Sequence, residues 1–475
     1  MAAGADMLEG HTGLYTDMYE LTMAEAYFRD GTAATPAVFD YFFRTLPFGG
    51  GFVVFAGLGD ALDLLEAFRF DAGDLDYLRG LGFAPDFLER MGRFRFRGAV
   101  HSIREGEVVF PLEPVLRVEA ALLEAQLVET ALLNILNFES LIATKAARLR
   151  LAAGPRLLSE FGLRRSHGPG GVLASRAAVI GGCDTTSDVY AARRYGLKPT
   201  GTMAHSYIES HGDELTAFRR FAEARPEGCI FLVDTYDTLR SGMPNAIRAA
   251  KEMEGRGDKL YAVRLDSGDL AYLAKQARRM LDESGLGYVR IMASNLLDEH
   301  VIRSLLEQGA PIDLFGVGTR LATGAPDGAL DGVYKLAESG GEPRLKVSES
   351  LAKTTLPGRK AVVRCSDAAG EFGADAVVLA DEPDVARMVH PFEPGQSLRL
   401  ADFAKERLHV KVMEDGRRLG GPEPVARIAA YAQSRLAALP PEHKRFENPH
   451  VYKVGLSDRL AELRDGLVRR FREEE

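Results

Sequence analysis

The sequence contains no tryptophan and only three cysteines, Cys183, Cys229 and Cys365, among its 475 residues. The cysteines are far apart in the chain and show none of the short spacings of a metal site. Their scarcity excludes a disulfide-stapled scaffold. It predicts reduced, structural thiols in a cytosolic setting.

Long apolar runs are also missing, since no stretch approaches the ~20 residues needed to span a bilayer. The beginning of the chain lacks a basic segment followed by an apolar one, so we expect no secretory signal. Basic charge is not in excess either, because 59 Lys and Arg stand against 68 Asp and Glu, a net charge of −9. We therefore expect a cytoplasmic protein without nucleic-acid or membrane partners, in which local cations and backbone amides hold any anionic substrate.

A repeating unit occupies residues 156–320: a short apolar run, a polar group, a Gly-containing loop and an amphipathic helix. The apolar runs cover residues 156–160, 229–233, 260–265, 288–292 and 312–317. Short runs rich in branched residues that alternate with helical patterns are typical of βαβ units. The predicted fold class is therefore α/β, with an irregular TIM-like α/β barrel over residues 146–340.

Two further regions flank this barrel, because the chain is too long for one hydrophobic core. Residues 1–145 predict an N-terminal α+β domain, with a helix at 18–29, an extended stretch at 37–44, strand-like alternation at 107–119 and a long helix at 122–147. Residues 341–475 predict a smaller C-terminal region that packs back on the N-terminal domain, with strand-like runs at 344–347, 361–364 and 376–379 and helices at 424–436 and 457–472.

Polar or otherwise distinctive residues follow the predicted strands of the barrel. The carboxyl ends of parallel strands meet at one rim, where barrel enzymes build their active sites. We expect the following residues to converge there: Phe161, Arg164, His205, Asp234, Arg264, Asp266, Ser294, Asn295, Gly318 and Thr319.

The segment GTMAHS, residues 201–206, places His205 at such a strand end, close to Thr202. Asp234 ends the next unit. A carboxylate on one imidazole nitrogen would leave the other nitrogen nucleophilic, as in a phosphate-accepting histidine. A purely structural histidine is the alternative, since most isolated histidines have no catalytic role.

The segment RLDSGD, residues 264–269, places an arginine in an otherwise apolar strand. Arg264 with Asp266 and Asp269 could grip an anion while orienting ribose hydroxyls or a magnesium ion. Helix capping explains Asp269 equally well, but it does not explain Arg264.

An aromatic ring stands beside two guanidinium groups in FGLRR, residues 161–165. This combination suits a planar ring that bears a carboxylate, because Phe161 can stack and Arg164 can bind the acid. A core phenylalanine with solvated arginines explains it equally well. Similarly, Ser294, Asn295, Gly318 and Thr319 suit phosphate binding in late barrel loops, but ordinary turn residues and helix caps have the same composition.

Taken together, these segments resemble the nicotinate phosphoribosyltransferase family, which has the type II phosphoribosyltransferase fold. The resemblance runs nearly from end to end, and its order and spacing agree. It includes YTDMYELTM (15–23), ET (129–130), ATK (143–145), FGLRR (161–165), GGCDTTS (181–187), GTMAHS (201–206), VDTYDT (233–238), RLDSGD (264–269), FGVGT (315–319) and NPHVY (448–452).

The resemblance implies a cytoplasmic homodimeric enzyme that makes nicotinate mononucleotide and diphosphate from nicotinate and 5-phosphoribosyl 1-diphosphate. This is the first step of nicotinate salvage to NAD. Mg²⁺ is the implied cofactor, and ATP is the implied co-substrate. No metal-ligand cluster in the chain itself is predicted.

The resemblance also implies roles for individual residues. His205 is transiently phosphorylated, with Asp234 as its acidic partner. Phe161 and Tyr19 sandwich the nicotinate ring, the latter from the other subunit. The remaining implied residues bind base, ribose or phosphate: Arg164, Asp184, Thr202, Arg264, Asp266, Ser294, Asn295, Gly318 and Thr319. Nicotinamide enzymes carry Gly-Asp where Ser294 and Asn295 stand and lack the second arginine of FGLRR, which favours nicotinate.

Several alternatives stay open at this point. A nicotinamide or quinolinate phosphoribosyltransferase of the same fold is one, and a non-catalytic binding homologue is another. A type I phosphoribosyltransferase is disfavoured because its small open sheet does not explain the repeats up to residue 320. The lysine that contacts the phosphates is also open, among Lys335, Lys346, Lys353 and Lys360.

Overall fold

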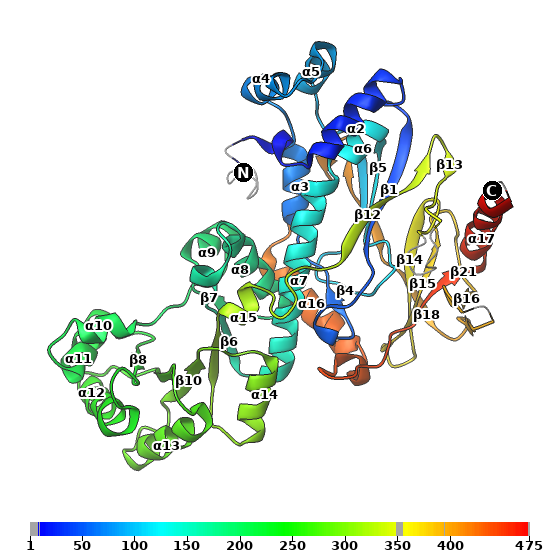
Figure 1. The fold of residues 1–475 in the computed structure, drawn as a ribbon. Helices are drawn as coiled ribbons and strands as arrows, with labels where there is room; N and C mark the ends of the chain where they lie inside the picture. Colours follow the sequence, from blue (N-terminus) through cyan, green and yellow to red (C-terminus); the bar gives the residue numbers. More distant parts are fainter. Residues whose placement is uncertain (1–7, 9, 348–354, 394, 474–475) are drawn as a thin grey trace. The chain divides into compact units, whose positions relative to one another are not determined.

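A computed structural model of the chain describes residues 8, 10–347, 355–393 and 395–473. The chain divides into two compact units (Figure 1). Unit 1 comprises residues 1–141, 329–423 and 430–475, and unit 2 comprises residues 142–328 and 424–429. The three regions expected from the sequence thus fall into two units, and most of residues 341–475 belongs to the same unit as the N-terminal region.

A seven-stranded antiparallel sheet forms the centre of unit 1, in the order β13-β12-β1-β5-β3-β19-β20. Its strands are β1 (Pro36–Phe43), β3 (Ala99–Ile103), β5 (Leu116–Ala121), β12 (Gly332–Ser339), β13 (Glu342–Pro343), β19 (His409–Glu414) and β20 (Arg417–Arg418). Strand β1 lies between β12 from the second chain segment and β5 from the first. Residues 344–347, predicted as a strand, lie just after β13 and are not part of a strand.

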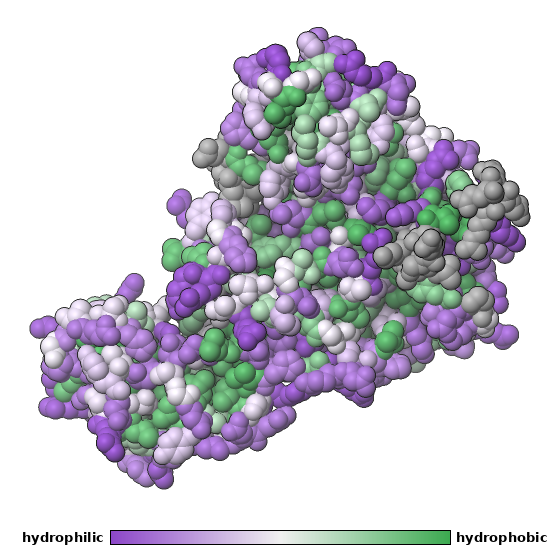
Figure 2. All heavy atoms as spheres, viewed as in Figure 1, coloured by the Kyte–Doolittle hydropathy of each residue, from purple (hydrophilic) through white to green (hydrophobic). Residues whose placement is uncertain are grey.

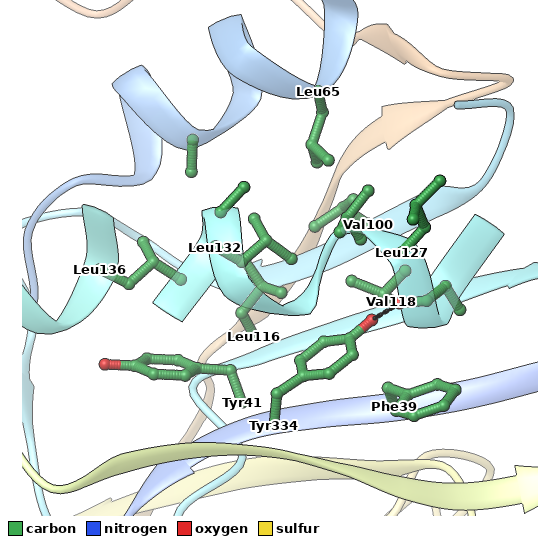
Figure 3. Packing of buried hydrophobic residues seen from close by; sticks show 14 of the residues in the cluster. Phe39, Tyr41, Leu65, Val100, Leu116, Val118, Leu127, Leu132, Leu136 and Tyr334 are labelled. Carbon is green, nitrogen blue, oxygen red and sulfur yellow. Dashed lines mark hydrogen bonds between the residues drawn. The ribbon is translucent and has the colours of Figure 1, made fainter. Parts of the chain in front are cut away.

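Helices cover this sheet and share one apolar core with it (Figure 3). They are α2 (Met18–Arg29), α3 (Leu58–Ala67), α4 (Ala72–Gly80), α5 (Pro85–Gly92), α6 (Leu122–Leu127) and the first half of α7 (Glu129–Ala153). Within the core, the rings of Phe39 and Tyr334 stack at 4.9 Å, and the buried Tyr334 hydroxyl donates to the carbonyl of Ala125 at 2.9 Å. The single long helix expected over 122–147 is in fact two, because α6 ends at Leu127 and Val128 forms a turn before α7 begins at Glu129.

A second, six-stranded sheet of unit 1 has the order β17-β16-β21-β15-β14-β18. Its strands are β14 (Lys360–Ser366), β15 (Phe372–Leu379), β16 (Arg387–Val389), β17 (Ser397–Arg399), β18 (Ala404–Arg407) and β21 (Val454–Ser457). A short pair, β2 (Val53–Val54) and β4 (Val108–Val109), lies apart from both sheets. The helices α16 (Val425–Ala438) and α17 (Asp458–Glu473) lie close to their predicted positions.

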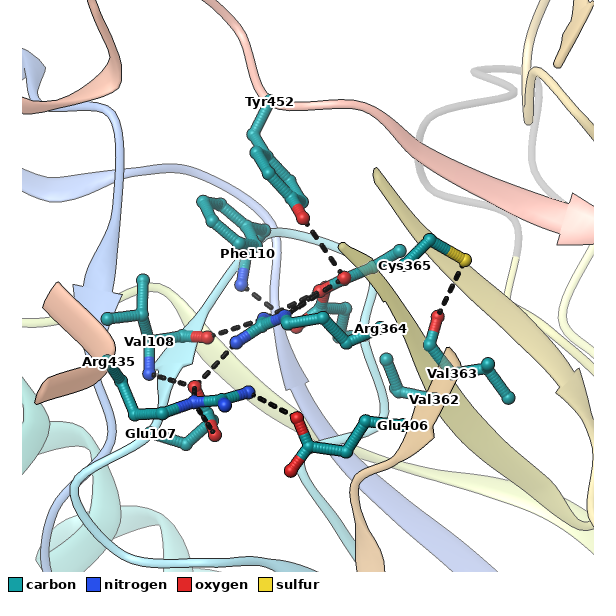
Figure 4. Close-up of polar contacts among 12 residues, drawn as sticks. Glu107, Val108, Phe110, Val362, Val363, Arg364, Cys365, Glu406, Arg435 and Tyr452 are labelled. Carbon is teal, nitrogen blue, oxygen red and sulfur yellow. Dashed lines mark hydrogen bonds and ion pairs between the residues drawn. The ribbon is translucent and has the colours of Figure 1, made fainter. Parts of the chain in front are cut away.

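A buried group of charges joins three segments of unit 1 (Figure 4). The fully buried Arg364 of β14 pairs with Glu107 at 2.5 Å and with Asp375 of β15 at 2.6 Å. Arg435 of α16 binds the same Glu107 at 2.7 Å, and the Tyr452 hydroxyl donates to Asp375 at 3.1 Å. Each of these buried charges therefore has an opposite charge, as burial requires.

Unit 2 contains a six-stranded sheet in which every pair is parallel, in the order β7-β6-β11-β10-β9-β8. The strands are β6 (Leu157–Glu160), β7 (Thr185–Thr186), β8 (Ile230–Leu232), β9 (Ala262–Leu265), β10 (Arg290–Ser294) and β11 (Leu314–Val317). The first and last long strands, β6 and β11, pair with each other, so the order is that of a ring opened between β7 and β8. The sheet is a half-barrel, and a closed TIM-like barrel is not observed.

Helices follow these strands as the repeats predicted. They are α8 (Gly170–Gly181), α9 (Val189–Tyr195), α10 (His205–Glu209), α11 (Glu214–Ala224), α12 (Met243–Gly255), α13 (Leu270–Glu283), α14 (Glu299–Glu307) and α15 (Thr319–Ala322). A π-helical turn (Thr238–Gly242) precedes α12. Because all strands run the same way, the loops that lead into these helices meet at the carboxyl edge of the sheet.

The surface and the thiols fit the composition. Hydrophilic residues cover much of the face drawn in Figure 2, with apolar residues scattered between them. Cys183, Cys229 and Cys365 are buried and form no disulfide. Within the described ranges, no helix combines the length and apolar character that crossing a membrane demands.

Candidate active site

Arg264 is the centre of the polar cluster at the carboxyl edge of unit 2. Its guanidinium donates to the Ser294 hydroxyl at 2.9 Å, to the Thr202 hydroxyl at 2.8 Å and to the Asp266 carboxylate at 2.8 Å. These partners come from β10, from the segment before α10 and from the end of β9 itself. Arg264 is 9% exposed. These directed bonds thus hold a nearly buried cation in one orientation, for which the rigid fork of the guanidinium is well suited.

Asp266 stays ionised in this cluster. Burial would raise the pKa of its carboxyl group, but hydrogen bonds from Ser294 and Arg264 and the charge of Arg264 outweigh burial, so the pKa lies below its ordinary value. Since the Asp266 carboxylate is bound by donors on one side, it adds a fixed negative charge to the edge.

His205 is the first residue of α10 and lies among these groups. Its Nδ1 is 3.1 Å from the Thr235 hydroxyl. Its Nε2 faces two carboxylates, 4.0 Å from Asp234 and 3.9 Å from Asp266, which is longer than a hydrogen bond. The structure therefore brings His205 and Asp234 together as predicted. The hydrogen-bond partner of the imidazole, however, is Thr235, which the sequence analysis overlooked although it directly follows Asp234.

Asp234 has a buried carboxylate with one free oxygen. Its Oδ2 accepts from the backbone N–H of Asp266 at 2.9 Å and from the Ser267 hydroxyl at 2.6 Å. Its Oδ1 is buried and has no hydrogen-bond partner among the described residues. Such an oxygen, next to Asp266, is a suitable ligand for a hard cation such as Mg²⁺.

Phe161 lies against the inner side of the half-barrel. It packs on a cluster that includes Met292, and the Arg264 guanidinium carbon is 5.9 Å from the centre of its ring. A Cβ added to Gly316 would lie 2.6 Å from a carbon of this ring, so only glycine lets the ring approach β11 so closely. The ring is therefore held at a fixed place beside Arg264.

The other predicted residues of this edge are more exposed. Arg164 lies in the short turn after β6, and none of the described residues forms a hydrogen bond or ion pair with its side chain. Asn295 follows β10 with a left-handed φ of 80°. Gly318 and Thr319 follow β11. All of them lie at the carboxyl ends of their strands, with side chains or amides available to a ligand.

Asp184 does not lie at the carboxyl end of its strand, so its role in the base pocket stays a prediction. Asp184 precedes β7, on the amino side of the sheet, and its carboxylate is bound to the backbone N–H of Leu158 at 2.8 Å and to Arg150 at 2.5 Å. Asp188, which follows β7, is the carboxylate at the carboxyl edge. It caps α9 through Oδ1, and its buried Oδ2 has no hydrogen-bond partner among the described residues. The motif GGCDTTSD contains both aspartates, and only the exact span of β7 distinguishes them.

Tyr19 belongs to unit 1, in the first turn of α2, and its side chain is exposed. Its neighbour Glu20 is buried and accepts hydrogen bonds from Thr16 and from both the N–H and the hydroxyl of Thr130. Burial raises the pKa of Glu20 to about 7, although these hydrogen bonds oppose the rise.

The four candidate lysines for phosphate binding have different surroundings. Lys360 is buried, and its ammonium donates to two backbone carbonyls and pairs with Asp40 at 2.7 Å, so all its protons are used. Lys335 is 3.6 Å from Glu129. Lys346 is exposed, whereas Lys353 lies outside the described residues. Lys335 and Lys346 thus remain candidates among the described lysines.

Comparisons with known proteins agree along the whole chain. The model of the "Nicotinate phosphoribosyltransferase (NAPRTase) family" matches residues 157–392, and the models of its N-terminal and C-terminal domains match residues 14–137 and 359–464. The chain is 45% identical over 458 residues to nicotinate phosphoribosyltransferase of Bacillus subtilis (strain 168). The aligned region covers 94% of this chain and 93% of the relative.

Solved structures have the same fold. The crystal structure of human nicotinic acid phosphoribosyltransferase matches with a TM-score of 0.86 at 34% identity, covering 95% of this chain and 99% of that chain. The crystal structure of nicotinate-nucleotide pyrophosphorylase from Pyrococcus furiosus matches with a TM-score of 0.72 at 27% identity. The match covers 90% of this chain and 96% of that chain.

Proposed function

Since this chain belongs to the nicotinate phosphoribosyltransferase family, we propose that it transfers the phosphoribosyl group of 5-phosphoribosyl 1-diphosphate to nicotinate. The products are nicotinate mononucleotide and diphosphate. In the same proposal, ATP hydrolysis drives the reaction through a phosphohistidine at His205, with Mg²⁺ as cofactor. The observation that carries the proposal is the cluster of Arg264, His205, Asp234 and Asp266 at one sheet edge.

The transfer itself needs positioning more than acid–base chemistry. The ring nitrogen of nicotinate carries a free lone pair, which attacks the anomeric carbon while the bond to diphosphate breaks and diphosphate keeps the electron pair. Phe161 stacks on the ring, and Arg164 pairs with its carboxylate. Arg264, Asp266, Ser294, Asn295, Gly318, Thr319 and Thr202 surround the ribose and its phosphates. Held in this geometry, the reactants lose little further entropy on reaction.

His205 would accept the γ-phosphoryl group of ATP, releasing ADP, and would lose it later to water. The Thr235 hydroxyl fixes the ring at Nδ1, which leaves Nε2 toward Asp234 and Asp266. A phosphoryl group on Nε2 would add negative charge next to two carboxylates. Asp234 and Asp266 are the residues that would hold Mg²⁺, which supplies charge neutralisation for the phosphates when bound.

The same edge supports a homodimer. Exposed apolar residues follow several strands of unit 2: Leu163 (41% exposed), Val189 (73%), Tyr190 (53%), Tyr236 (60%) and Leu296 (69%). Exposed apolar groups that gather at one edge mark an interface. In the proposed dimer a second copy covers this edge, and Tyr19 of that copy stacks on nicotinate opposite Phe161.

The half-barrel is proposed to be the family's irregular barrel. Pro199 bridges Thr186 in parallel, beyond the end of the sheet at β7. The segment then supplies Thr202, whose hydroxyl is bound to Arg264 of β9. Residues 199–203 thus bring an extended segment to the gap between β7 and β8.

Labelling with γ-³²P-ATP tests the role of His205. We expect acid-labile label on the wild type and none on His205→Asn, which should keep a slow, ATP-independent formation of nicotinate mononucleotide. His211→Asn is the matched control, because His211 is bound to the Tyr207 carbonyl and its ring contacts the Tyr207 ring at a tilt, outside the cluster. Unchanged labelling of His205→Asn would exclude this histidine as the acceptor.

A further inference from the structure

We infer that Glu160 is a positioning residue, whose carboxylate locks the turn that carries Phe161 and Arg164 to β7 and α8. The inference rests on the proposed function of this edge. Glu160 is the last residue of β6 and is 1% exposed. It directly precedes Phe161 in the chain. The position of Glu160 therefore constrains the position of the proposed nicotinate-stacking ring.

Three donors from three elements converge on this carboxylate. Oε1 accepts from the backbone N–H of Gly162, inside the turn. Oε2 accepts from the Ser175 hydroxyl of α8 at 3.0 Å and from the Thr186 hydroxyl of β7 at 2.6 Å. All three donors are neutral, which is an unusual environment for a buried carboxylate. Glu160 is therefore not explained by an ion pair. It is explained by the need for a side chain that can accept several hydrogen bonds at once.

The bonds of Glu160 extend to the next carboxylate of the edge. The Thr186 hydroxyl that donates to Glu160 also accepts from the backbone N–H of Asp188 at 3.0 Å. In addition, the carbonyl of Glu160 accepts from the N–H of Ser187 at 2.9 Å. One residue therefore sets the position of both the Phe161 turn and the start of the loop after β7.

The first residue of the turn, Gly162, is closely packed. A Cβ on Gly162 would lie 2.3 Å from the Cβ of Ala322 and 3.1 Å from the carbonyl oxygen of Gly318. The turn is thus held between the Glu160 carboxylate and the loop after β11, which is the proposed phosphate loop. Glu160 consequently fixes the distance between the base-stacking ring and that loop, the quantity on which transfer between two bound substrates depends.

Steady-state kinetics of Glu160→Gln test this role. Glutamine keeps the size of the side chain but replaces one acceptor oxygen by an NH₂ group. We expect KM for nicotinate to rise and kcat to fall, with kcat/KM lowered about ten- to a hundredfold, and a smaller change in KM for 5-phosphoribosyl 1-diphosphate. A purely structural role would reduce the amount of active enzyme, and so lower kcat at unchanged KM.

Matched variants complete the design. Asp313→Asn removes a carboxylate that accepts from the backbone N–H of Ile291 at 2.9 Å, before β11 in the same sheet, and should leave KM unchanged. Thr186→Val and Ser175→Ala each remove one donor to Glu160 and should raise KM for nicotinate less than Glu160→Gln does.

The outcomes are decisive in both directions. A folded Glu160→Gln protein with an unchanged KM for nicotinate overturns the inference. If that variant does not fold, the Thr186→Val and Ser175→Ala proteins decide, because unchanged KM in both also overturns it. Product formation by the wild type in the same assay tests the proposed function separately.

Discussion

Arg164 and Arg264 carry the same charge in opposite surroundings. Arg264 is nearly buried and bound to three neighbours, so its position is set before any ligand arrives. Arg164 is exposed in a turn. The buried arginine is therefore suited to organise the site, and the exposed one to bind a charged group of the substrate.

Substitution of Arg164 should change the choice between nicotinate and nicotinamide. A charge-assisted contact to the nicotinate carboxylate contributes about 1.5–3 kcal/mol over a neutral amide, or about ten- to a hundredfold in specificity. We expect Arg164→Ala to abolish most of this ratio of kcat/KM values. Arg220→Ala, on the exposed face of α11, should not alter it. A wild type that uses both substrates equally would contradict the assignment.

Glu20 should make stability depend on pH. Its pKa is about 7 in the folded protein, against an ordinary value of 4.5, so the folded state keeps the proton that the unfolded state has already released between these values. Stability should therefore fall as pH rises from about 4.5 to about 7, by at most about 3 kcal/mol. Urea unfolding at several pH values measures this fall.

The control for this prediction is Glu20→Gln, which cannot titrate and should lack the decline. Substitution of the exposed Glu209 by Gln should preserve the decline. A wild-type profile that is flat across the window would show that burial does not raise the pKa of Glu20.

At the scale of elements, β11 determines where the base-stacking ring lies. Gly316→Ala would place a Cβ 2.6 Å and 2.7 Å from two carbons of the Phe161 ring, so the ring must shift. We expect KM for nicotinate to rise about tenfold or more. Gly287→Ala is the control, because its Cβ would lie 3.5 Å from the Asp282 carboxylate, an ordinary contact distance. Equal kinetics of the two variants would mean that the ring position is not critical.

Five of the six strands of unit 2, all except β7, could be predicted because their apolar runs are short and each is followed by a helical pattern. The ends of these strands then brought Asp234, Arg264, Asp266 and Ser294 to one edge without any knowledge of contacts, whereas His205, predicted at a strand end, begins α10 after a segment that is not a strand.

The features that the sequence does not predict depend either on the exact residues at which a strand begins and ends or on how side chains and loops pack. Asp184 and Asp188 differ only in which side of the two-residue strand β7 they occupy. The interruption of the long helix at Val128 leaves no mark in the apolar pattern. The partnership of Thr235 with His205 requires the course of a loop, which side-chain chemistry alone does not specify.

At the scale of the whole molecule, the proposed dimer predicts complementation between two chains that each lack ATP-coupled activity. Tyr19→Ala and His205→Ala each disable one contribution to every site of a homodimer. Mixed dimers of the two variants contain one site with both residues intact, so activity should return to about a quarter to a half of the wild-type value per dimer. Mass spectrometry verifies that mixed dimers have formed. If these mixed dimers show no activity, the proposed shared site is wrong.

The buried charges around Arg364 restrict how this protein can evolve. Arg364 pairs with Glu107, which lies 257 positions away in the chain, and with Asp375. Loss of Arg364 leaves the buried Asp375 without its cation and costs about 3–5 kcal/mol, although well-packed apolar residues could replace the whole set at little cost. Single mutations therefore meet a barrier that simultaneous ones avoid. We therefore expect Glu107, Arg364 and Asp375, although far apart in the chain, to be substituted together during evolution rather than one at a time.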